Sequence, residues 1–262
     1  MRKYLIILDL NGTLLHRLTK PAEQQLAKTH PKYVPAEHKL STNKQPVYLR
    51  PHLDHFLKTL KTNKRLEVAV WTSAMEHNAQ AMINCLPLYM SGSFKFVWGQ
   101  GKCLAVPQPG ESTPIFQKPL SQVLTEYKNE FERENVLIVD DSQEKFLEED
   151  RLNHVCLPEY SVCLEDVDFT KDDALMILSD WITKMLSEIE EKESLVSYLK
   201  AHPPQFESKE VHPPQSELKE PKEVIVENAN NANNANNDIK EESRTALPAD
   251  EVISTLIEKL KI

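Results

Sequence analysis

The sequence predicts an α/β fold in which a parallel sheet is covered by helices on both faces. Two observations lead to this class. Short apolar runs typical of buried strands alternate along the chain with segments of helical periodicity, the order in which parallel strands and crossover helices follow one another. The first run, LIIL at residues 5–8, is apolar throughout, as in a strand buried on both faces.

Four strands are expected, at 4–9, 66–72, 94–98 and 135–140. Between and after them, helical patterns occur at 52–61, 74–86, 119–133 and 144–150. A longer pattern at 172–199 forms one amphipathic face from Leu175, Leu178, Trp181, Ile182, Met185, Leu186 and Ile189. We expect this face to cover the core, because such stripes usually pack within their own domain; docking of a partner is the alternative.

Composition limits the class of protein. With 262 residues and 40% hydrophobic content, the chain has room for one buried domain and an appendage. The net charge of -9 argues against general nucleic-acid binding. No apolar run approaches the roughly 20 residues of a membrane span, and no transit peptide precedes the first strand. Cys85, Cys103, Cys156 and Cys163 show no CxxC pairing, so we expect reduced thiols in a soluble cytoplasmic or nuclear protein.

The composition changes after the domain, which is expected to span 1–200. Residues 201–248 contain two HPPQ copies and the stretch NANNANNANND, which offer too little apolar surface to offset the entropy of ordering, so we expect a disordered linker. Residues 249–262 are expected to form a short amphipathic helix with Val252, Ile253, Leu256, Ile257 and Leu260 on one face. This helix could fray, dock back on the domain or bind another protein.

The segment Asp9-Leu10-Asn11-Gly12-Thr13 follows the first strand directly. An aspartate at the carboxyl end of such a strand, before a glycine turn whose N–H groups can face an anion, is suited to accept a phosphoryl group. This segment is therefore the first candidate for a catalytic site.

Three further segments carry matching chemistry. Thr72 and Ser73 end the second strand with hydroxyls that can donate to a phosphoryl group, and Lys118 offers a positive charge. Asp140 and Asp141 end a strand as paired carboxylates that suit Mg²⁺. Each has a structural alternative: a helix cap for the hydroxyls, a solvated lysine, and an N-cap cluster for the aspartates. Their common order along a doubly wound pattern favours a phosphoryl-binding site.

These segments support a resemblance to a known family. LDLNGT resembles the nucleophile loop DxDxT of the haloacid dehalogenase (HAD) superfamily. The strings LRPHLDHFL, VAVWTSA, KPLS and VLIVDDS are similar to the catalytic domain of the RNA polymerase II C-terminal-domain (CTD) phosphatases, the NLI-interacting factor type. The resemblance covers roughly residues 3–200. It implies a Rossmann-like HAD fold and a Mg²⁺-dependent phosphatase acting on phosphoserine or phosphothreonine of a phosphoprotein or phosphopeptide.

The resemblance also implies roles for residues. Asp9 would be the nucleophile that becomes an aspartyl phosphate, and position 11 the general acid and base. Thr13 completes the loop motif. Mg²⁺ would be held by Asp9, the backbone of Asn11, Asp140 and Asp141. Thr72 and Lys118 would neutralise and orient the phosphoryl oxygens, assisted by Gly12 and Ser73.

Asn11 departs from the motif, because an amide can neither give nor take the proton. General acid–base help is worth about 10² to 10⁴ in rate. The chain is therefore expected to be either a slow phosphatase or a pseudophosphatase that binds without efficient turnover. His16 could substitute as a base or have a structural role. A role like that of the phosphatase-like subunit of the mitochondrial presequence translocase is disfavoured, since we find no transit or membrane segment.

The stretch between Thr13 and Arg50 is rich in basic residues. It carries Arg17, Lys20, Lys28, Lys32, Lys39 and Lys44 against only Glu23 and Glu37. Because it follows the nucleophile loop, its positive field could draw a phosphorylated or acidic peptide to the site. The alternative is a solvated insertion without a ligand.

Overall fold

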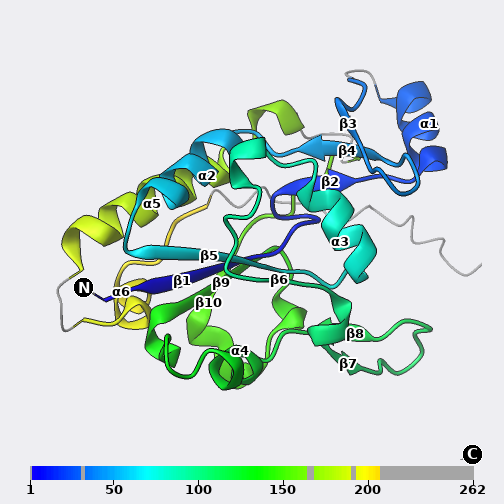
Figure 1. Cartoon of the computed structure of the whole chain (residues 1–262). Coiled ribbons are helices and arrows are strands. Elements are labelled where there is room, and N and C mark those ends of the chain that lie inside the picture. The colour runs from blue at the N-terminus through cyan, green and yellow to red at the C-terminus, as the bar shows by residue number, and fades with distance from the viewer. Residues whose placement is uncertain (1, 31–32, 164–167, 190–192, 207–262) are drawn as a thin grey trace, which may run out of the picture. The chain divides into compact units, whose positions relative to one another are not determined.

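A five-stranded parallel sheet lies at the centre of the domain (Figure 1). Its strand order is β10 (His154–Cys156), β9 (Val136–Asp140), β1 (Tyr4–Leu8), β5 (Leu66–Trp71) and β6 (Val97–Trp98). The chain runs from β1 through β5 to β6 on one side, and later through β9 to β10 on the other. The strand order therefore reverses between β1 and β9, the position where open α/β sheets bind ligands.

The computed structural model describes residues 2–30, 33–163, 168–189 and 193–206. The expected linker beyond residue 206 and the expected helix at 249–262 lie outside these residues. No helix of the described part is long and apolar enough to cross a bilayer. The four cysteines, Cys85, Cys103, Cys156 and Cys163, are free thiols.

Helices cover both faces of the sheet. Because successive side chains of a strand point to opposite faces, β1 contributes to two separate cores. Tyr4, Ile6 and Leu8 belong to the larger core. This core includes side chains of α2 (Leu53–Thr62), α3 (Glu76–Ile83), α5 (Ala174–Glu188) and α6 (Leu195–Ala201). Leu5 and Ile7 point to the other core, with side chains of α4 (Leu120–Glu126). The predicted α/β class, with a parallel sheet between helical layers, is confirmed.

Several expected helices differ from those of the structure. The pattern at 172–199 is divided into α5 and α6, and the segment expected at 119–133 is helical only over α4. The helix expected at 144–150 is replaced by two 3₁₀ segments, Gln143–Lys145 and Glu148–Asn153. A tertiary contact explains this last difference: the buried Asp150 accepts from the N–H of Leu120 at 2.9 Å and so satisfies the start of α4.

Two insertions flank the carboxyl ends of the strands (Figure 1). The first contains α1 (Lys20–Thr29) and a small antiparallel sheet of β2 (Leu15–Arg17), β4 (Pro46–Leu49) and β3 (His38–Lys39). The second is the hairpin of β7 (Leu104–Val106) and β8 (Ile115–Gln117). The sequence analysis did not predict these elements. For α1 a signal existed, since Thr19 caps the helix and a proline occupies its first turn.

The first HPPQ copy, expected in the linker, packs on the domain. The N–H of His202 donates to the carbonyl of Tyr198 at 2.8 Å, and the indole N–H of Trp181 donates to the carbonyl of His202 at 2.5 Å. Phe206 packs against the larger core. The folded part therefore extends at least to Phe206, beyond the expected boundary at residue 200.

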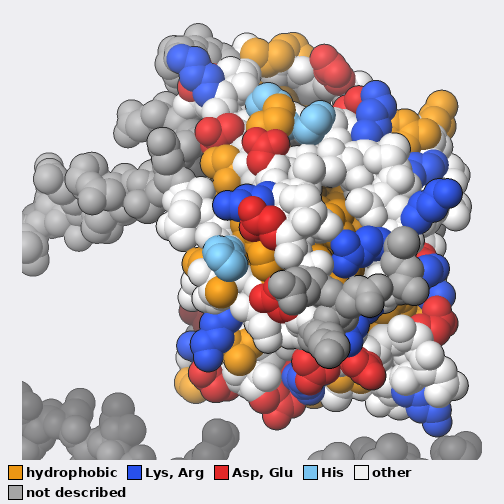
Figure 2. All heavy atoms as spheres, turned by 90° about the vertical axis from the view of Figure 1, so that its left-hand side faces the viewer, with side chains coloured by type: hydrophobic (Ala, Val, Ile, Leu, Met, Phe, Trp, Pro, Cys, Tyr) orange, Lys and Arg blue, Asp and Glu red, His pale blue; other side chains and the backbone are white. Residues whose placement is uncertain are grey.

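The surface at the amino ends of the strands carries charges of both signs. Lys and Arg side chains are interspersed there with Asp and Glu (Figure 2). Lys3, just before β1, pairs with Glu67 of β5. Such pairs are remote from the carboxyl ends of the strands, so they provide control positions for changes made at that edge.

Arg50 joins the loop after β1 to two later segments. Its buried guanidinium binds Asp172 through Nε–Oδ1 and Nη2–Oδ2 at 2.7 and 3.0 Å. It also donates to the carbonyls of Thr13 and Pro158 at 3.0 and 2.8 Å. A bidentate pair of this kind fixes orientation as well as distance. Arg50 thus fixes the backbone at Thr13 relative to the start of α5.

Replacing Arg50 by methionine should destabilise the protein by about 3 to 5 kcal/mol, because Asp172 would remain buried without its partner. Urea unfolding measures the loss. Arg151→Met is the matched control, since Arg151 pairs with Glu148 on the surface, where both side chains are more than two-thirds exposed (70% and 79%). Its loss should stay within about 0.5 kcal/mol. Similar losses in both variants would contradict the role assigned to Arg50.

Candidate active site

Two carboxylates meet at the point where the strand order reverses. Asp9 follows β1, Asp140 ends β9, and both are almost fully buried. Lys118, which is also fully buried, lies between them. Its Nζ is 2.8 Å from Asp9 Oδ1 and 2.5 Å from Asp140 Oδ2. The structure therefore brings together three predicted site residues that lie far apart in the sequence.

Asp141 forms the third corner of this carboxylate cluster, which consists of Asp9, Asp140 and Asp141. Each of the three offers one oxygen, and these oxygens lie within 4.8 Å of one another. Asp141 accepts from Thr13 Oγ1 at 3.0 Å and from Ser142 Oγ at 3.0 Å. Three oxygen donors with full negative charges are what a hard divalent cation prefers, so the residues present fit Mg²⁺.

Lys145 is a site residue that the sequence analysis missed. Its Nζ is 2.9 Å from Asp140 Oδ1, 3.6 Å from Asp141 Oδ1 and 3.7 Å from Asp9 Oδ2. The expected helix at 144–150 gave no reason to place Lys145 beside the carboxylates. In the structure, Lys145 ends the 3₁₀ segment Gln143–Lys145. The available signal was its position five residues after Asp140. Two ammonium groups thus face three carboxylates.

Burial and charge set the protonation states of the cluster. Burial disfavours the ionised form of Asp140, but Lys118 and Lys145 outweigh it and lower its pKa to about 2. The same attraction, to Asp140 and Asp9, overcomes burial at Lys118 and raises its pKa. For Asp141, burial and the charges of Asp140 and Asp9 prevail over the attraction of Lys145, so its pKa rises to about 6. On acidification, Asp141 is therefore protonated at a higher pH than Asp140.

The turn after Asp9 depends on Gly12. Its φ is +87°, and a Cβ there would lie 2.6 to 2.8 Å from the carboxylate atoms of Asp141. Its N–H, expected to face an anion, donates instead to the carbonyl of Leu15 at 2.8 Å. The geometry thus gives Gly12 a role in close packing of the loop against Asp141, and it leaves that N–H unavailable to a phosphate.

The side chain of Asn11 is exposed and stabilises the turn through a hydrogen bond. Its Oδ1 accepts from the N–H of Arg17 at 2.9 Å. His16, considered as a substitute base, has its Nδ1 engaged with the N–H of Val162 at 2.9 Å. Burial lowers the pKa of His16 to about 4, so it is neutral at pH 7. A neutral imidazole has one nitrogen that can accept a proton, and in His16 this nitrogen already accepts from the N–H of Val162. This contact indicates a structural role for His16.

Thr72 and Ser73 differ in their placement. Thr72 is buried at the end of β5, the neighbour of β1, and its Oγ1 accepts from the N–H of Ala74 at 3.4 Å. Its O–H remains able to donate. Neither residue caps α3, whose N-cap is Met75. The carbonyl of Ser73 accepts from the side-chain amide of Gln100 at 3.2 Å.

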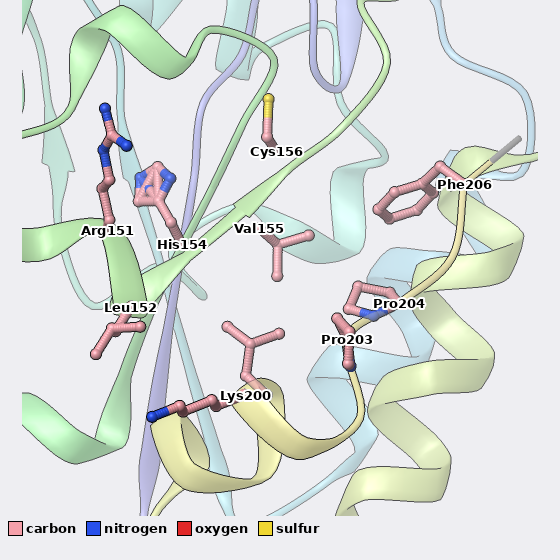
Figure 3. A pocket seen from close by; sticks show the side chains of 10 residues that line it. Arg151, Leu152, His154, Val155, Cys156, Lys200, Pro203, Pro204 and Phe206 are labelled. Atoms are coloured by element: carbon pink, nitrogen blue, oxygen red, sulfur yellow. The ribbon is translucent and has the colours of Figure 1, made fainter. Parts of the chain in front are cut away.

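A separate pocket lies between β10 and the segment that follows α6 (Figure 3). Its volume is about 220 Å³, and its lining includes Val155, Pro203, Pro204 and Phe206. None of the three clustered carboxylates lines it. Arg151, His154 and Lys200 also line this pocket, but no carboxylate of the described residues does, so it offers neither an acidic nucleophile nor a carboxylate to hold a metal. We therefore assign the chemistry to the carboxylate cluster and not to this pocket.

Asp141→Asn should stabilise the protein at pH 7 in the presence of a metal chelator. Because the pKa of Asp141 is raised to about 6 in the folded state, from 3.8, the native carboxylate is held ionised at pH 7 at a cost. Removing that charge should add about 1 to 3 kcal/mol. The gain should shrink as the pH falls through 6 and vanish near pH 4, where the native carboxyl is already protonated. Chemical unfolding at both pH values measures it, and a gain independent of pH would contradict this reading.

Gly12→Ala should destabilise the protein more than Gly110→Ala does. Both glycines have positive φ, +87° and +84°, so both substitutions carry a backbone penalty of about 1 to 2 kcal/mol. Only at Gly12 would the new Cβ meet another group; at Gly110 nothing lies within 4 Å. The overlap with Asp141 should add about 1 to 3 kcal/mol. Urea unfolding measures the free energy of unfolding of both variants. Equal losses of stability would show that a Cβ at position 12 does not overlap with Asp141.

Comparisons with known proteins test the resemblance to the CTD phosphatases. Comparison with curated proteins gives no match. Among solved structures, the chain is similar to the fission yeast RNA polymerase II CTD phosphatase Fcp1 bound to beryllium fluoride. The identity is 15%, the match covers 71% of this chain and 51% of that chain, and the TM-score is 0.42.

Two further structures are similar to this chain. A second structure of Fcp1, described as an essential RNA polymerase II CTD phosphatase, is 15% identical over 75% of this chain and 56% of that chain, with a TM-score of 0.41. A HAD-superfamily hydrolase of subfamily IA from Geobacter sulfurreducens is 16% identical over 58% of this chain and 83% of that chain, with a TM-score of 0.32. The matches span about half the length of the two Fcp1 chains.

A family model gives the decisive match. The model described as NLI interacting factor-like phosphatase matches residues 4–194, which include the carboxylate cluster, both lysines and the loop that carries Asn11. This match covers well over half of the chain. The chain therefore belongs to the family of NLI interacting factor-like phosphatases.

Proposed function

We propose that the protein is a Mg²⁺-dependent phosphoprotein phosphatase that acts slowly on phosphoserine or phosphothreonine through an aspartyl phosphate on Asp9. One observation supports this most directly. The buried Lys118 binds both Asp9 and Asp140 at the reversal of the strand order, with Asp141 beside them. Burying several charged groups together is costly even when they are paired, and such a group of ionised residues in one place is typical of a catalytic site.

The two oxygens of Asp9 have different surroundings. Oδ1 accepts from Lys118 at 2.8 Å, whereas Oδ2 has Lys145 Nζ at 3.7 Å, beyond hydrogen-bond reach. Oδ2 is therefore the oxygen available to attack phosphorus. A bond forms from Oδ2 to phosphorus, the bond from phosphorus to the substrate oxygen breaks, and that oxygen takes a proton from solvent water. A water molecule then attacks the phosphorus of the aspartyl phosphate and gives its proton to solvent, and the bond from phosphorus to Asp9 breaks, which releases phosphate and the free carboxylate.

Other residues stabilise charge during these steps. Lys118 is fixed by two carboxylates and can face the phosphoryl oxygens as a positioned cation. The O–H of Thr72 can donate to the same group. Asp9, Asp140 and Asp141 would hold Mg²⁺, with the backbone carbonyl of Asn11 as a further oxygen donor. When bound, the metal supplies positive charge that neutralises the phosphoryl oxygens.

Asn11 supports a second candidate function, a pseudophosphatase that binds a phosphorylated protein without efficient turnover. Its amide cannot transfer the proton that the leaving oxygen requires, and its Oδ1 is already bonded to the backbone of Arg17. His16 is neutral and engaged, so it offers no replacement base. A serine or threonine leaves as a poor alkoxide and is affected most, whereas a phenol leaves more easily.

We further propose that the substrate is a phosphorylated or acidic peptide drawn in by the basic insertion, and that the protein acts in the cytoplasm or nucleus. The insertion begins directly after Thr13, and it contains α1 and the sheet of β2, β3 and β4. Its positive charge, close to the nucleophile Asp9, would raise the local concentration of such a peptide. The C-terminal segment remains a candidate for binding another protein.

Asn11→Asp should raise phosphatase activity, and Asp9→Asn should abolish it. Restoring the acid–base carboxylate is worth about 10² to 10⁴ in kcat for a phosphoserine peptide, and less for an aryl phosphate, whose leaving group needs little protonation. Initial rates with both substrates in Mg²⁺ measure the change.

Asp9→Asn in the Asn11→Asp background is the control for contaminating phosphatase. Slow native turnover that disappears in Asp9→Asn supports the enzyme, whereas a silent native chain that Asn11→Asp activates supports the pseudophosphatase. If Asn11→Asp leaves both rates at the level of Asp9→Asn, the aspartyl-phosphate proposal is wrong.

A further inference from the structure

We propose that Lys145 is an internal counter-ion that occupies the carboxylate cluster in the metal-free protein and that Mg²⁺ must displace. This inference rests on the proposed function only in taking the cluster as the Mg²⁺ site. It concerns a residue that neither the loop motif nor the family resemblance singled out.

The two lysines divide the oxygens of the cluster between them. Lys118 takes Asp9 Oδ1 and Asp140 Oδ2. The Nζ of Lys145 faces the remaining oxygens of the same residues, Asp140 Oδ1 at 2.9 Å and Asp9 Oδ2 at 3.7 Å, and also Asp141 Oδ1 at 3.6 Å. Of these, Asp140 Oδ1 and Asp141 Oδ1 are the oxygens that Lys118 leaves for a divalent cation, whereas Asp9 Oδ2 is the oxygen proposed to attack phosphorus. The ammonium of Lys145 therefore stands where the metal charge is needed.

Lys145 and a metal ion cannot share these oxygens closely. Mg²⁺ binds its ligands at about 2.1 Å and demands near-octahedral geometry, so an ion on Asp140 Oδ1 would lie within about 5 Å of an ammonium hydrogen-bonded to that oxygen. Little water separates two cations at that distance in a buried cluster, so their repulsion is weakly screened. Metal binding is therefore coupled to withdrawal of Lys145.

The surroundings of the two lysines explain why Lys145 is the one that moves. Lys118 is fully buried, whereas the side chain of Lys145 is 15% exposed and belongs to a short 3₁₀ segment. A lysine with four rotatable methylenes at the edge of the site can carry its ammonium to water. Lys118 has no such path and stays with Asp9 and Asp140.

The counter-ion also explains how the cluster is tolerated without metal. Three carboxylates with one lysine would leave two uncompensated negative charges in a largely buried site, whereas the second lysine leaves one. The ammonium of Lys145 would therefore stabilise the metal-free fold and weaken the affinity for metal at the same time. Removal of Lys145 should therefore change these two properties in opposite directions.

Lys145→Gln in the full chain tests this inference, with Mg²⁺ alone as the probe. The variant should bind Mg²⁺ about tenfold more tightly or better by isothermal titration calorimetry, because the competing charge is gone. Its Tm in a metal chelator should fall below that of the parent, and the rise in Tm on adding Mg²⁺ should be larger. Neither readout requires turnover.

Lys3→Gln is the matched control, since it removes the same charge from an ion pair at the amino ends of the strands. It should leave Mg²⁺ affinity unchanged. Equal or weaker Mg²⁺ binding by Lys145→Gln would overturn the inference, and so would the absence of binding in both parent and variant. Tighter Mg²⁺ binding together with no phosphatase activity in any variant would leave Lys145 as proposed and refute the proposed enzyme, so the two failures are distinguishable.

Discussion

The buried contact of Lys118 with Asp9 and Asp140 is the interaction on which the rest of the site depends. Two carboxylates that end adjacent parallel strands repel each other at close range, and burial makes that repulsion stronger. Lys118 compensates it and, together with Lys145, lowers the pKa of Asp140 to about 2. Asp150 fixes the start of α4, which begins two residues after Lys118, by accepting from the N–H of Leu120. The segment that follows Lys145 in the sequence thus fixes the helix start beside the central cation of the site.

The loop after β1 is held by contacts that contribute no chemistry. Arg50 fixes the carbonyl of Thr13, and Thr13 donates to Asp141. Gly12 lets the loop approach Asp141 more closely than any other residue would allow. Asn11 bonds the backbone of Arg17 and keeps the turn closed. The shape of the loop therefore depends on Arg50, Thr13 and Gly12 as well as on the side chain at position 11.

The charge balance of the cluster is one-sided. Two lysines against three carboxylates leave one uncompensated negative charge, which a divalent cation would neutralise. Asp141, whose pKa is raised to about 6, is the least compensated member. Keeping Asp141 ionised in this buried, negatively charged cluster lowers the stability of the fold, and a lower stability is common at catalytic sites.

By itself, the sequence determined the fold class, the strands at the centre of the sheet and most of the candidate site. The apolar runs that became β1, β5 and β9 are strongly patterned, and Asp9, Lys118, Asp140 and Asp141 were linked by their order at strand and helix boundaries. Local pattern failed where long-range contacts decide: the segment at 144–150 is not a helix, because Asp150 is needed at the start of α4. Only the tertiary structure could place Lys145 in the cluster and engage the N–H of Gly12 with Leu15, because both depend on side-chain and backbone partners brought together by folding.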